Sequence, residues 1–400
     1  MSHIVSFRVE GLTGRKKPLE LELNRDTNIF FGLNGSGKTS LLKIFHAAMA
    51  NNTKILAAVP FTAAEVSIYS MTWKKVFTRS IKKIGVARDT GSRGRRVIHR
   101  ELTIGREVVT AEEEIRPEEG LTWTCTPATP KEASSSRWAH EYLPTSRLHV
   151  SDEDELYGLP IEYTRQNRPW LTEEQLDSFF ARSVEQLWSR YSAQVLGAVR
   201  KAQEQGLASI LRAVLSPESA SGRRRTSKLT VATAYERVEN FLKRQGSASI
   251  LGTQAAFEKR YAADATLQDV VQDIDLVEDK IKDAMTSRNT LQELITRMFS
   301  GNKKICFTDE SIEVNIPSGE KIGLASLSSG EKHLLLIFVQ SLLVGESSMM
   351  IDEPEISMHV DWQKDLIRSV RALNPEAQLI FATHSPEIMA DIPDDKIFRI

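Results

Sequence analysis

The feature that most constrains this chain is the segment FFGLNGSGKTSLLKIF at residues 30–45, where a glycine-rich stretch separates two apolar runs. Gly32, four further residues and the sequence Gly-Lys-Thr at 37–39 fit the spacing G-x-x-x-x-G-K-[ST]. Glycine at such positions lets the backbone wrap closely around an oligophosphate, whose charge then faces the loop N–H groups and the start of a helix. The segment therefore predicts a nucleotide phosphate site between a buried strand at 27–31 and a helix at 40–50.

Two residues of this loop have distinct expected roles. The ammonium group of Lys38 would reach the β- and γ-phosphates of the nucleotide, and the hydroxyl of Thr39 would bind Mg²⁺. The residues expected to contact the nucleotide here are Gly32, Asn34, Gly35, Ser36, Gly37, Lys38, Thr39 and Ser40.

The composition is that of an ordinary globular protein. The chain has 400 residues, of which 41% are hydrophobic and 26% charged, and its net charge of −1 indicates no general affinity for nucleic acid. The first residues, MSHIVSFRVEGL, lack the plan of a signal peptide, and the longest apolar stretch, 334–344, is too short to span a bilayer. We therefore expect a cytosolic protein without a membrane partner. Cys125 and Cys306 are isolated and lack metal or redox spacing.

The N-terminal part of the chain is expected to be rich in strands. The segments HIVSFRVEG, LELEL and TNIFFG precede the phosphate loop. β-rich pieces separated by polar turns at 51–135 predict an antiparallel β subdomain.

The pattern changes to helical spacing after this region. Apolar residues recur at three- and four-residue steps from 172 to 198 and again from 267 to 298, which predicts a helical insertion. A hairpin with a partly coiled-coil seam and ordinary helices packed on the core are both compatible with this spacing. After Gly301, strand–helix–strand order implies a parallel sheet, so the fold class is α/β with a mixed sheet. The expected division is an N-terminal lobe at 1–171, a helical insertion at 172–300 and a C-terminal lobe at 301–400.

The C-terminal lobe supplies the carboxylates that a phosphate site needs. Asp352 ends the apolar run MMID, which places it at the carboxyl edge of the sheet, beside the phosphate loop. Together with Thr39 it would hold Mg²⁺. Glu353 follows immediately and is placed to orient and polarise the attacking water. Because phosphoryl transfer depends mainly on positioning and charge stabilisation, these groups and Lys38 form a sufficient set.

Two further motifs complete the predicted site. The sequence LSSGEKHLLLIF, which begins at Leu327, places small polar residues at a helix start, where backbone N–H groups and a serine hydroxyl would form a second anion site. Its members are Ser328, Ser329, Gly330 and Glu331. The segment IFATHSPEIM places His384 just past a strand, within reach of a γ-phosphate. A lone histidine there is more often structural, and the accompanying motifs favour a catalytic role.

In this order, GLNGSGKTS, LSSGEK, MMIDEPEISMH and ATHSP resemble the Walker A, signature, Walker B/D-loop and switch-histidine motifs of ABC-type ATPases. The resemblance spans residues 4–400 and implies an ABC-type P-loop head that binds and hydrolyses ATP with Mg²⁺. In that superfamily the signature motif of one subunit closes over nucleotide held by another. The resemblance therefore implies a homodimer, or a higher homo-oligomer, that sandwiches ATP. The residues that would act in trans are Ser328, Gly330 and Glu331. The catalytic set would be Lys38, Glu353 and His384.

The sequence motifs DEPEISMH, ATHSPEIM and YLPTSRLHV are similar to those of SMC-like ATPases of antiphage defence, namely the OLD group, the Septu ATPase and the PARIS ATPase. In that group the YLPTSR segment lies near the nucleotide, which adds Arg147 to the expected site. OLD proteins carry a Toprim nuclease after the ATPase, whereas this sequence ends at DDKIFRI without one. The resemblance implies an ATPase-only form whose effector, with a nuclease as the favoured class, is a separate polypeptide.

Two basic stretches leave a partnership with DNA or RNA open. Such patches bind phosphate backbones, but a protein-binding surface or solvated strands and loops explain them as well. One stretch is GRRRTSK at 222–228. The other, at 74–106, contains Lys74, Lys75, Arg79, Lys82, Lys83, Arg88, Arg93, Arg95, Arg96, Arg100 and Arg106.

The sequence thus favours a cytosolic ATPase that dimerises around ATP and regulates or scaffolds a separate effector in antiphage defence. The main alternative is a DNA-repair or DNA-clamp ATPase that acts on DNA directly. A transporter ATPase subunit is a second alternative, although its signature usually has two consecutive glycines where this chain has LSSGE. A nucleotide-dependent scaffold with slow turnover is the third.

Overall fold

The computed structural model describes residues 2–83, 97–104, 107–114, 121–127, 137–145, 172–215, 230–244, 251–299, 301 and 303–400. The chain divides into two compact units. The first unit consists of Met1–Val184, Met298–Lys304 and Val314–Ile400, and the second consists of Glu185–Arg297 and Ile305–Glu313. The three-part division expected from the sequence, with boundaries after residues 171 and 300, stays a prediction.

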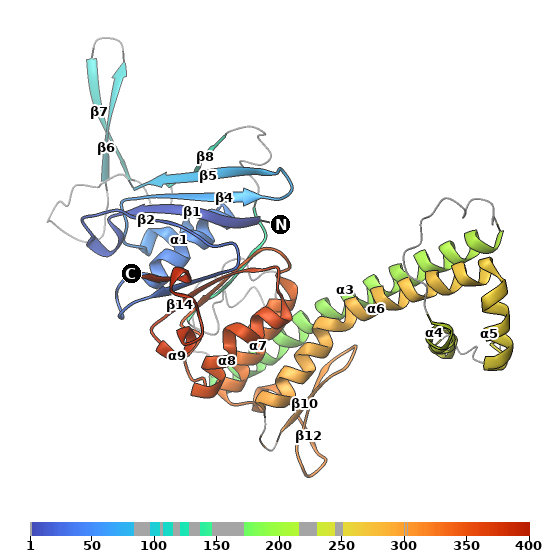
Figure 1. Ribbon diagram of the computed structural model, residues 1–400. Helices are drawn as coiled ribbons and strands as arrows, with labels where there is room; N and C mark the ends of the chain where they lie inside the picture. The colour runs from blue at the N-terminus through green and yellow to red at the C-terminus, as the bar shows by residue number, and fades with distance from the viewer. Residues whose placement is uncertain are drawn as a thin grey trace. The chain divides into compact units, whose positions relative to one another are not determined.

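A parallel five-stranded sheet forms the inner layer of the first unit, in the order β15-β3-β14-β13-β9 (Figure 1). Its strands are β3 (Thr27–Phe31), β9 (His140–Leu143), β13 (Ser348–Asp352), β14 (Gln378–Thr383) and β15 (Ile397–Arg399). Every neighbouring pair is parallel. All residues of β13 and β14 are buried, as strands covered on both faces require. The parallel sheet expected from the strand–helix–strand order is confirmed.

Helices cover both faces of this sheet, with α1 on one face and α7 and α8 on the other (Figure 1). The helices of the first unit are α1 (Lys38–Ala50), α7 (Ser329–Leu343), α8 (Val360–Leu373) and α9 (Pro386–Met389). α1 begins two residues earlier than expected, because the φ of 106° at Gly37 turns the loop directly into the helix. α7 begins with a capping box, in which the Ser328 hydroxyl accepts from the Glu331 N–H and the Glu331 carboxylate accepts from the Ser328 N–H.

An antiparallel five-stranded sheet forms the outer layer of the first unit, in the order β2-β1-β4-β5-β8. Its strands are β1 (Ser2–Glu10), β2 (Leu19–Glu22), β4 (Ala63–Ser70), β5 (Lys75–Lys82) and β8 (Thr124–Thr126). The antiparallel subdomain expected at 51–135 is confirmed, and the structure adds β1 and β2 to it. A separate antiparallel pair consists of β6 (Val97–Ile104) and β7 (Glu107–Glu114).

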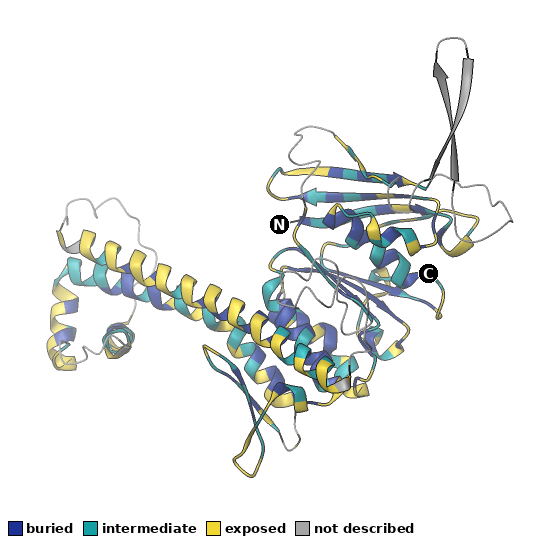
Figure 2. Ribbon diagram, turned by 180° about the vertical axis from the view of Figure 1, so that it is seen from behind, coloured by how far each residue is buried: buried dark blue, intermediate teal, exposed yellow. Residues whose placement is uncertain are grey.

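α1 lies between the two sheets and forms the centre of the main core (Figure 2). The ring of Phe45 contacts Phe7 of β1 with centroids 5.0 Å apart, and Phe30 of β3 with centroids 6.0 Å apart. All three side chains are at least 98% buried. The helix that follows the phosphate loop is therefore held by aromatic contacts from both sheets.

Gln378 fastens the two sheets to each other. It is the first residue of β14 and is fully buried. Its amide oxygen accepts from the Ile4 N–H at 2.9 Å and from the Ser348 hydroxyl at 2.7 Å. Its amide nitrogen donates to the carbonyl oxygens of Ile4 at 2.7 Å and Asn24 at 2.9 Å. The full donor and acceptor capacity of the amide is used, as its burial requires.

Arg79 is buried, which corrects its place in the basic stretch at 74–106. Phe77, Arg79 and Ile81 alternate along β5 on its buried face, and Arg79 is 0% exposed. Its guanidinium carbon lies 3.9 Å from the centre of the Trp138 ring, and it donates a hydrogen bond to a carbonyl of α1. Arg79 therefore belongs to the core and cannot bind a phosphate backbone at the surface. Outside the described residues lie Arg88, Arg93, Arg95, Arg96, Arg106 and the stretch 222–228.

The second unit is built on two long helices that run side by side in opposite directions (Figures 1 and 2). The helices of the insertion are α3 (Glu173–Leu215), α4 (Val231–Arg244), α5 (Gln254–Ala263) and α6 (Ala265–Met298). Gly206 of α3 allows a close approach to α6, because a Cβ there would lie 2.0 Å from a methyl carbon of Val277. α4 and α5 pack around a separate core that includes Val238, Phe257 and Ile274. The helical insertion is confirmed, and its two long helices form a hairpin.

Three short strands follow this hairpin in the chain: β10 (Lys304–Phe307), β11 (Ile312–Asn315) and β12 (Lys321–Ile322). The indole N–H of buried Trp188 in α3 donates to the Thr308 carbonyl at 2.9 Å, and its ring lies 4.8 Å from that of Phe307. Residues 305–313 therefore pack on α3 inside the second unit. The remaining elements are the 3-10 turns η1 (Leu12–Gly14), η2 (Lys54–Ala58), η7 (Leu324–Ser326) and η8 (Asp394–Lys396).

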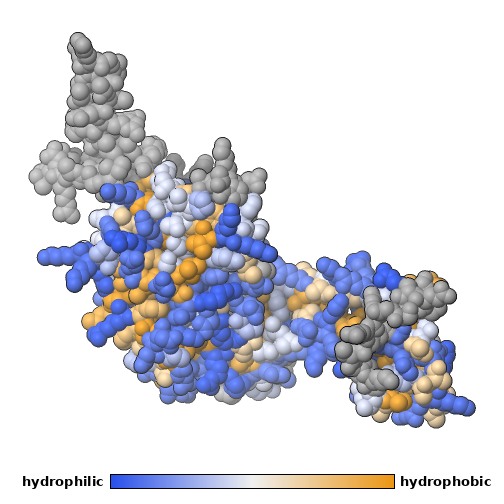
Figure 3. Space-filling view, turned by 45° about the horizontal axis from the view of Figure 1, so that its top comes forward, coloured by the Kyte–Doolittle hydropathy of each residue, from blue (hydrophilic) through white to orange (hydrophobic). Residues whose placement is uncertain are grey.

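Among the described residues, no helix has both the length and the apolar character needed to cross a bilayer. On the face shown in Figure 3, hydrophilic residues are interspersed with smaller hydrophobic areas.

Replacing Gln378 by leucine should destabilise the first unit by about 3 kcal/mol or more. The buried backbone groups of Ile4 and the carbonyl of Asn24 would lose their partners, at a cost of about 1–3 kcal/mol each. Urea-induced unfolding followed by circular dichroism measures the change. The control is Gln203→Leu on the exposed face of α3, which should leave the transition midpoint nearly unchanged. Equal midpoints for the two variants would show that Gln378 does not fasten the sheets.

Candidate nucleotide-binding site

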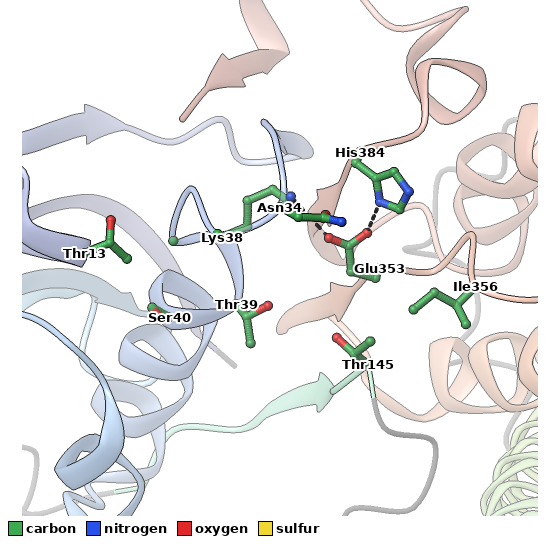
Figure 4. Close-up of a pocket in the computed structure, with 11 residues that line it drawn as sticks. Thr13, Asn34, Lys38, Thr39, Ser40, Thr145, Glu353, Ile356 and His384 are labelled. Carbon is green, nitrogen blue, oxygen red and sulfur yellow. Dashed lines mark hydrogen bonds and ion pairs between the residues drawn. The ribbon is translucent and has the colours of Figure 1, made fainter.

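A cavity of about 400 Å³ lies in the first unit, where the phosphate loop meets the carboxyl ends of β13 and β14 (Figure 4). Its volume falls within the range of small-molecule sites. The residues that line it are Thr13, Asn34, Gly35, Gly37, Lys38, Thr39, Ser40, Thr145, Glu353, Ile356 and His384. The structure thus brings together most of the loop residues expected from the sequence with Glu353 and His384. Gly32 and Ser36 of the loop do not line the cavity.

Position 32 requires glycine because neighbouring atoms lie too close for a side chain, and not because of its φ angle. A Cβ at this position would lie 2.4 Å from the carbonyl oxygen of Ile400 and 2.8 Å from the Ser36 hydroxyl. Ile400 is held there because its N–H donates to the Phe31 carbonyl at 2.8 Å, directly after β15 pairs with β3. The first glycine of the loop is therefore fixed by packing against the strand beside it.

Lys38 is held inside the loop by three oxygen partners. Its side chain is 4% exposed, and its ammonium group donates to the Gly32 carbonyl at 2.8 Å and the Leu33 carbonyl at 3.4 Å. The same group lies 3.2 Å from Oε1 of Glu353, whose side chain is 12% exposed. This buried ion pair joins the phosphate loop to the end of β13.

Asp352 is surrounded by hydroxyl groups. It is 1% exposed, and its two carboxylate oxygens accept from the Thr39 hydroxyl at 3.1 Å and the Thr145 hydroxyl at 2.7 Å. Burial raises the pKa of Asp352, and these hydrogen bonds oppose that shift. The carboxylate and the Thr39 hydroxyl form an oxygen donor set of the kind that Mg²⁺ prefers.

Thr145 was missed by the sequence reasoning. It belongs to the YLPTSR segment directly after β9, where only Arg147 was singled out. β9 pairs with β13, so its end lies beside Asp352, and this pairing could not be read from local sequence. Arg147 lies outside the described residues.

Glu353 adopts an unusual backbone conformation at the end of its strand. Its φ is 49°, a left-handed value that is costly for a residue with a side chain, and its N–H donates to the Ala382 carbonyl at 2.7 Å. The carboxylate accepts from Nδ1 of His384 at 2.5 Å, the contact drawn in Figure 4. Burial opposes ionisation, but hydrogen bonds from Glu355 and His384 and the charge of Lys38 lower the pKa of Glu353.

Glu355 is a second carboxyl group that the sequence reasoning did not single out. One of its oxygens, Oε1, accepts from the Thr383 hydroxyl at 2.6 Å and from the His384 N–H at 2.8 Å. The same oxygen lies 2.9 Å from Nδ1 of His384. Burial raises the pKa of Glu355. The only sequence signal was its place in DEPE, three residues after Asp352.

A second group of metal-ligating atoms includes two residues that line the cavity, Glu353 and His384. Glu353, Glu355 and His384 each offer an atom within 4.8 Å of the others. The ammonium group of Lys38 already contacts Glu353 and disfavours a cation there. The oxygen set around Asp352 is the better candidate for Mg²⁺.

The serine turn at the start of α7 is placed apart from the cavity. None of Ser328, Ser329, Gly330 and Glu331 is among the residues that line it. Ser328 and Ser329 are exposed, and Gly330 is buried against the turn that follows Glu355. A Cβ at Gly330 would lie 2.2 Å from the Ser357 carbonyl oxygen. Burial of the Glu331 carboxyl group opposes its ionisation. Hydrogen bonds from Lys303, at 2.8 Å, and from Ser328 outweigh this effect and lower the pKa of Glu331.

A comparison with protein families matches residues 163–390 to the family described as "AAA domain, putative AbiEii toxin, Type IV TA system". The match covers more than half of the chain. The chain belongs to this AAA domain family. The matched span contains the serine turn, Asp352, Glu353 and His384, whereas the phosphate loop lies before it.

Individual relatives of this AAA domain are distant. A segment of 95 residues is 26% identical to the "Retron Vc95 probable ATPase" of Vibrio cholerae serotype O1 biovar El Tor. The aligned segment covers 20% of this chain and 18% of the relative. The chain therefore spans less than a fifth of that curated relative.

Among solved structures, this chain is similar to an Smc head domain from Pyrococcus furiosus. That head domain has an extended coiled coil and is bound to the C-terminal domain of ScpA. That similarity has a TM-score of 0.40 and 12% identity, and covers 98% of this chain and 92% of that chain. The SMC head domain of Thermotoga maritima gives a TM-score of 0.35 and 11% identity, and covers 97% of this chain and 91% of that chain.

Replacing Gly330 by alanine should destabilise the start of α7 by about 1–3 kcal/mol. The added methyl group would overlap a backbone carbonyl at Ser357, so either the serine turn or the turn after Glu355 must move. Thermal unfolding measures the change. The matched control is Gly197→Ala in α3, where nothing lies within 4 Å and the helical propensity of alanine should maintain or raise stability. A neutral Gly330→Ala would show that the two turns are not in close contact.

Proposed function

We propose that this AAA domain is a magnesium-dependent ATPase that dimerises, or forms a higher homo-oligomer, around ATP and in that state regulates a separate effector protein in antiphage defence. The observation that carries the ATPase assignment is the convergence of the phosphate loop, the Glu353 carboxylate and His384 on one cavity, with Asp352 bound directly to Thr39 of the loop. The retron ATPase relative and the family description support the defence assignment.

The residues of the cavity have complementary tasks in ATP hydrolysis. Lys38 and the loop N–H groups bind the β- and γ-phosphates. Thr39 and Asp352 hold Mg²⁺, which when bound supplies positive charge beside the phosphates, and Thr145 orients the Asp352 carboxylate. Entry of phosphate draws Lys38 away from Glu353. The Glu353 carboxylate is then free to orient and polarise the attacking water, and His384 contacts the γ-phosphate.

The serine turn has a role between subunits in this proposal. Ser328 and Ser329 expose polar groups at the N-terminus of a helix of 15 residues, where anions are favoured. Because none of these residues lines the cavity of its own chain, they are available to nucleotide held by a second copy. The set proposed to act in trans is Ser328, Ser329, Gly330 and Glu331.

Direct action on DNA or RNA has weaker support. Arg79 is buried in the core, and most of the arginines that suggested a nucleic-acid surface lie outside the described residues. A protein effector, with a nuclease as the favoured class, remains the proposed partner.

The variant Glu353→Gln should trap ATP in an assembled dimer, because only the carboxylate that polarises water is changed. Its turnover should fall by on the order of 100-fold or more while ATP is retained. Lys38→Ala should fail to bind ATP and stay monomeric. The control is Glu376→Gln, an exposed glutamate outside the cavity, which should behave as the wild type. Size-exclusion chromatography with light scattering, in ATP and Mg²⁺, reads the assembly. A Glu353→Gln protein that stays monomeric at saturating ATP would contradict the dimer.

Defence is tested separately, in cells that express this gene with its genomic neighbours. The wild type should reduce phage plaque formation, and Lys38→Ala should abolish the protection without loss of protein. A nuclease that co-purifies with the Glu353→Gln assembly would identify the effector. Equal plaque formation with wild type and Lys38→Ala, or co-purification with a membrane permease, would contradict the defence assignment.

A further inference from the structure

Glu355 links the ends of the two strands that carry the cavity. It lies in the turn after β13, is 7% exposed, and directs Oε1 at the end of β14. There Oε1 accepts from the Thr383 hydroxyl at 2.6 Å and from the backbone N–H of His384 at 2.8 Å. These two contacts fix the backbone position from which the imidazole projects.

The same oxygen also lies close to the imidazole ring. Nδ1 of His384 lies 2.5 Å from Oε2 of Glu353 and 2.9 Å from Oε1 of Glu355. The Glu353 carboxylate oxygen is an acceptor, so Nδ1 carries a proton that it donates there. Nε2 is then the ring atom that remains for a contact elsewhere, and the ring is half exposed at the cavity.

We propose that Glu355 is a positioning residue that keeps the proton of His384 on Nδ1 and presents Nε2 to the γ-phosphate. The inference rests on the proposed ATPase function for the identity of the ligand. Glu355 itself does not line the cavity, and it acts through His384, whose Nδ1–H is accepted by the Glu353 carboxylate. The arrangement gives one buried carboxyl group control over both residues expected to act on the terminal phosphate.

The energetic reason for a carboxyl group at this position is the number of donors that meet there. One oxygen of Glu355 accepts from a hydroxyl and a backbone N–H, and it also lies 2.9 Å from the ring Nδ1. An apolar side chain would leave the Thr383 hydroxyl and the backbone N–H of His384 without this partner. The ring would then no longer be held against the Glu353 carboxylate and could exchange its proton between the two nitrogens. The amide oxygen of glutamine can accept from the same hydroxyl and backbone N–H, so glutamine is the conservative replacement.

The experiment compares Glu355→Leu, Glu355→Asp and Glu355→Gln with the wild type. In protein labelled with ¹⁵N at histidine, long-range ¹H–¹⁵N spectra report the ring tautomer, and His384→Ala identifies the His384 signals. The wild type should show the proton on Nδ1. Glu355→Leu should show a shift toward Nε2, and Glu355→Asp, whose oxygens are withdrawn by one methylene, should shift in the same direction. Glu355→Gln should keep the wild-type tautomer.

Kinetics provide the second readout. Glu355→Leu and Glu355→Asp should lower kcat by about 10- to 100-fold with KM for ATP changed by less than about threefold, because phosphate binding by the loop is untouched. Glu355→Gln should restore most of kcat. Thr383→Val is the matched structural control: it removes one donor to the same oxygen and should lower stability without moving the tautomer.

The outcomes separate the positioning role from the proposed function. A tautomer and kcat that stay unchanged in Glu355→Asp and Glu355→Leu would overturn the role of Glu355 while leaving the ATPase intact. A fall in kcat equal to that of Thr383→Val, with no tautomer shift, would also overturn it. Absence of ATP turnover in the wild type would refute the ATPase, and the spectra of the nucleotide-free protein would still decide whether Glu355 sets the proton. If Glu355→Leu does not fold, Glu355→Asp carries both readouts.

Discussion

The ion pair between Lys38 and Glu353 joins the two halves of the cavity, which are separated by more than 300 residues of sequence. Both charges are almost fully buried, so the attraction between them is offset largely by the cost of removing each from water. Such a pair stabilises little in itself, but a charge left alone there is costly. In the proposed function, an oligophosphate offers Lys38 a stronger partner and leaves Glu353 to bind water. The pair therefore couples phosphate entry to the release of the group proposed to activate water.

Much of the first unit could be predicted because its signals are local. The phosphate loop, the runs MMID and QLIFAT and the serine turn each have a spacing that a single strand or helix start explains, and the structure has these elements at those places. Asp352 was expected at a strand end beside the loop, and it contacts Thr39 there. Parallel pairing then brings Glu353 and His384 together without further information, since both follow the carboxyl ends of neighbouring strands.

Other features depend on pairings that no local pattern encodes. Thr145 reaches Asp352 only because β9 joins the sheet next to β13, although a long stretch of sequence separates Leu143 from Ser348. Glu355 contacts His384 only because the turn after β13 folds back on the end of β14. Arg79 is a different case, because two sequence signals disagreed. Its alternation with Phe77 and Ile81 along β5 indicates the buried face of the strand, whereas the many basic residues around it favoured a position at the protein surface.

β14 carries Gln378 at its first position and leads directly from Thr383 to His384. At one end, the amide is bound to the outer sheet, and at the other the imidazole lies in the cavity. A strand of this kind, about 3.3 Å long per residue and buried on both faces, transmits displacement along its axis with little bending. Any sliding of one sheet over the other would thus reach the imidazole as a movement of similar size, which makes this short strand a rigid mechanical link between the outer sheet and the cavity.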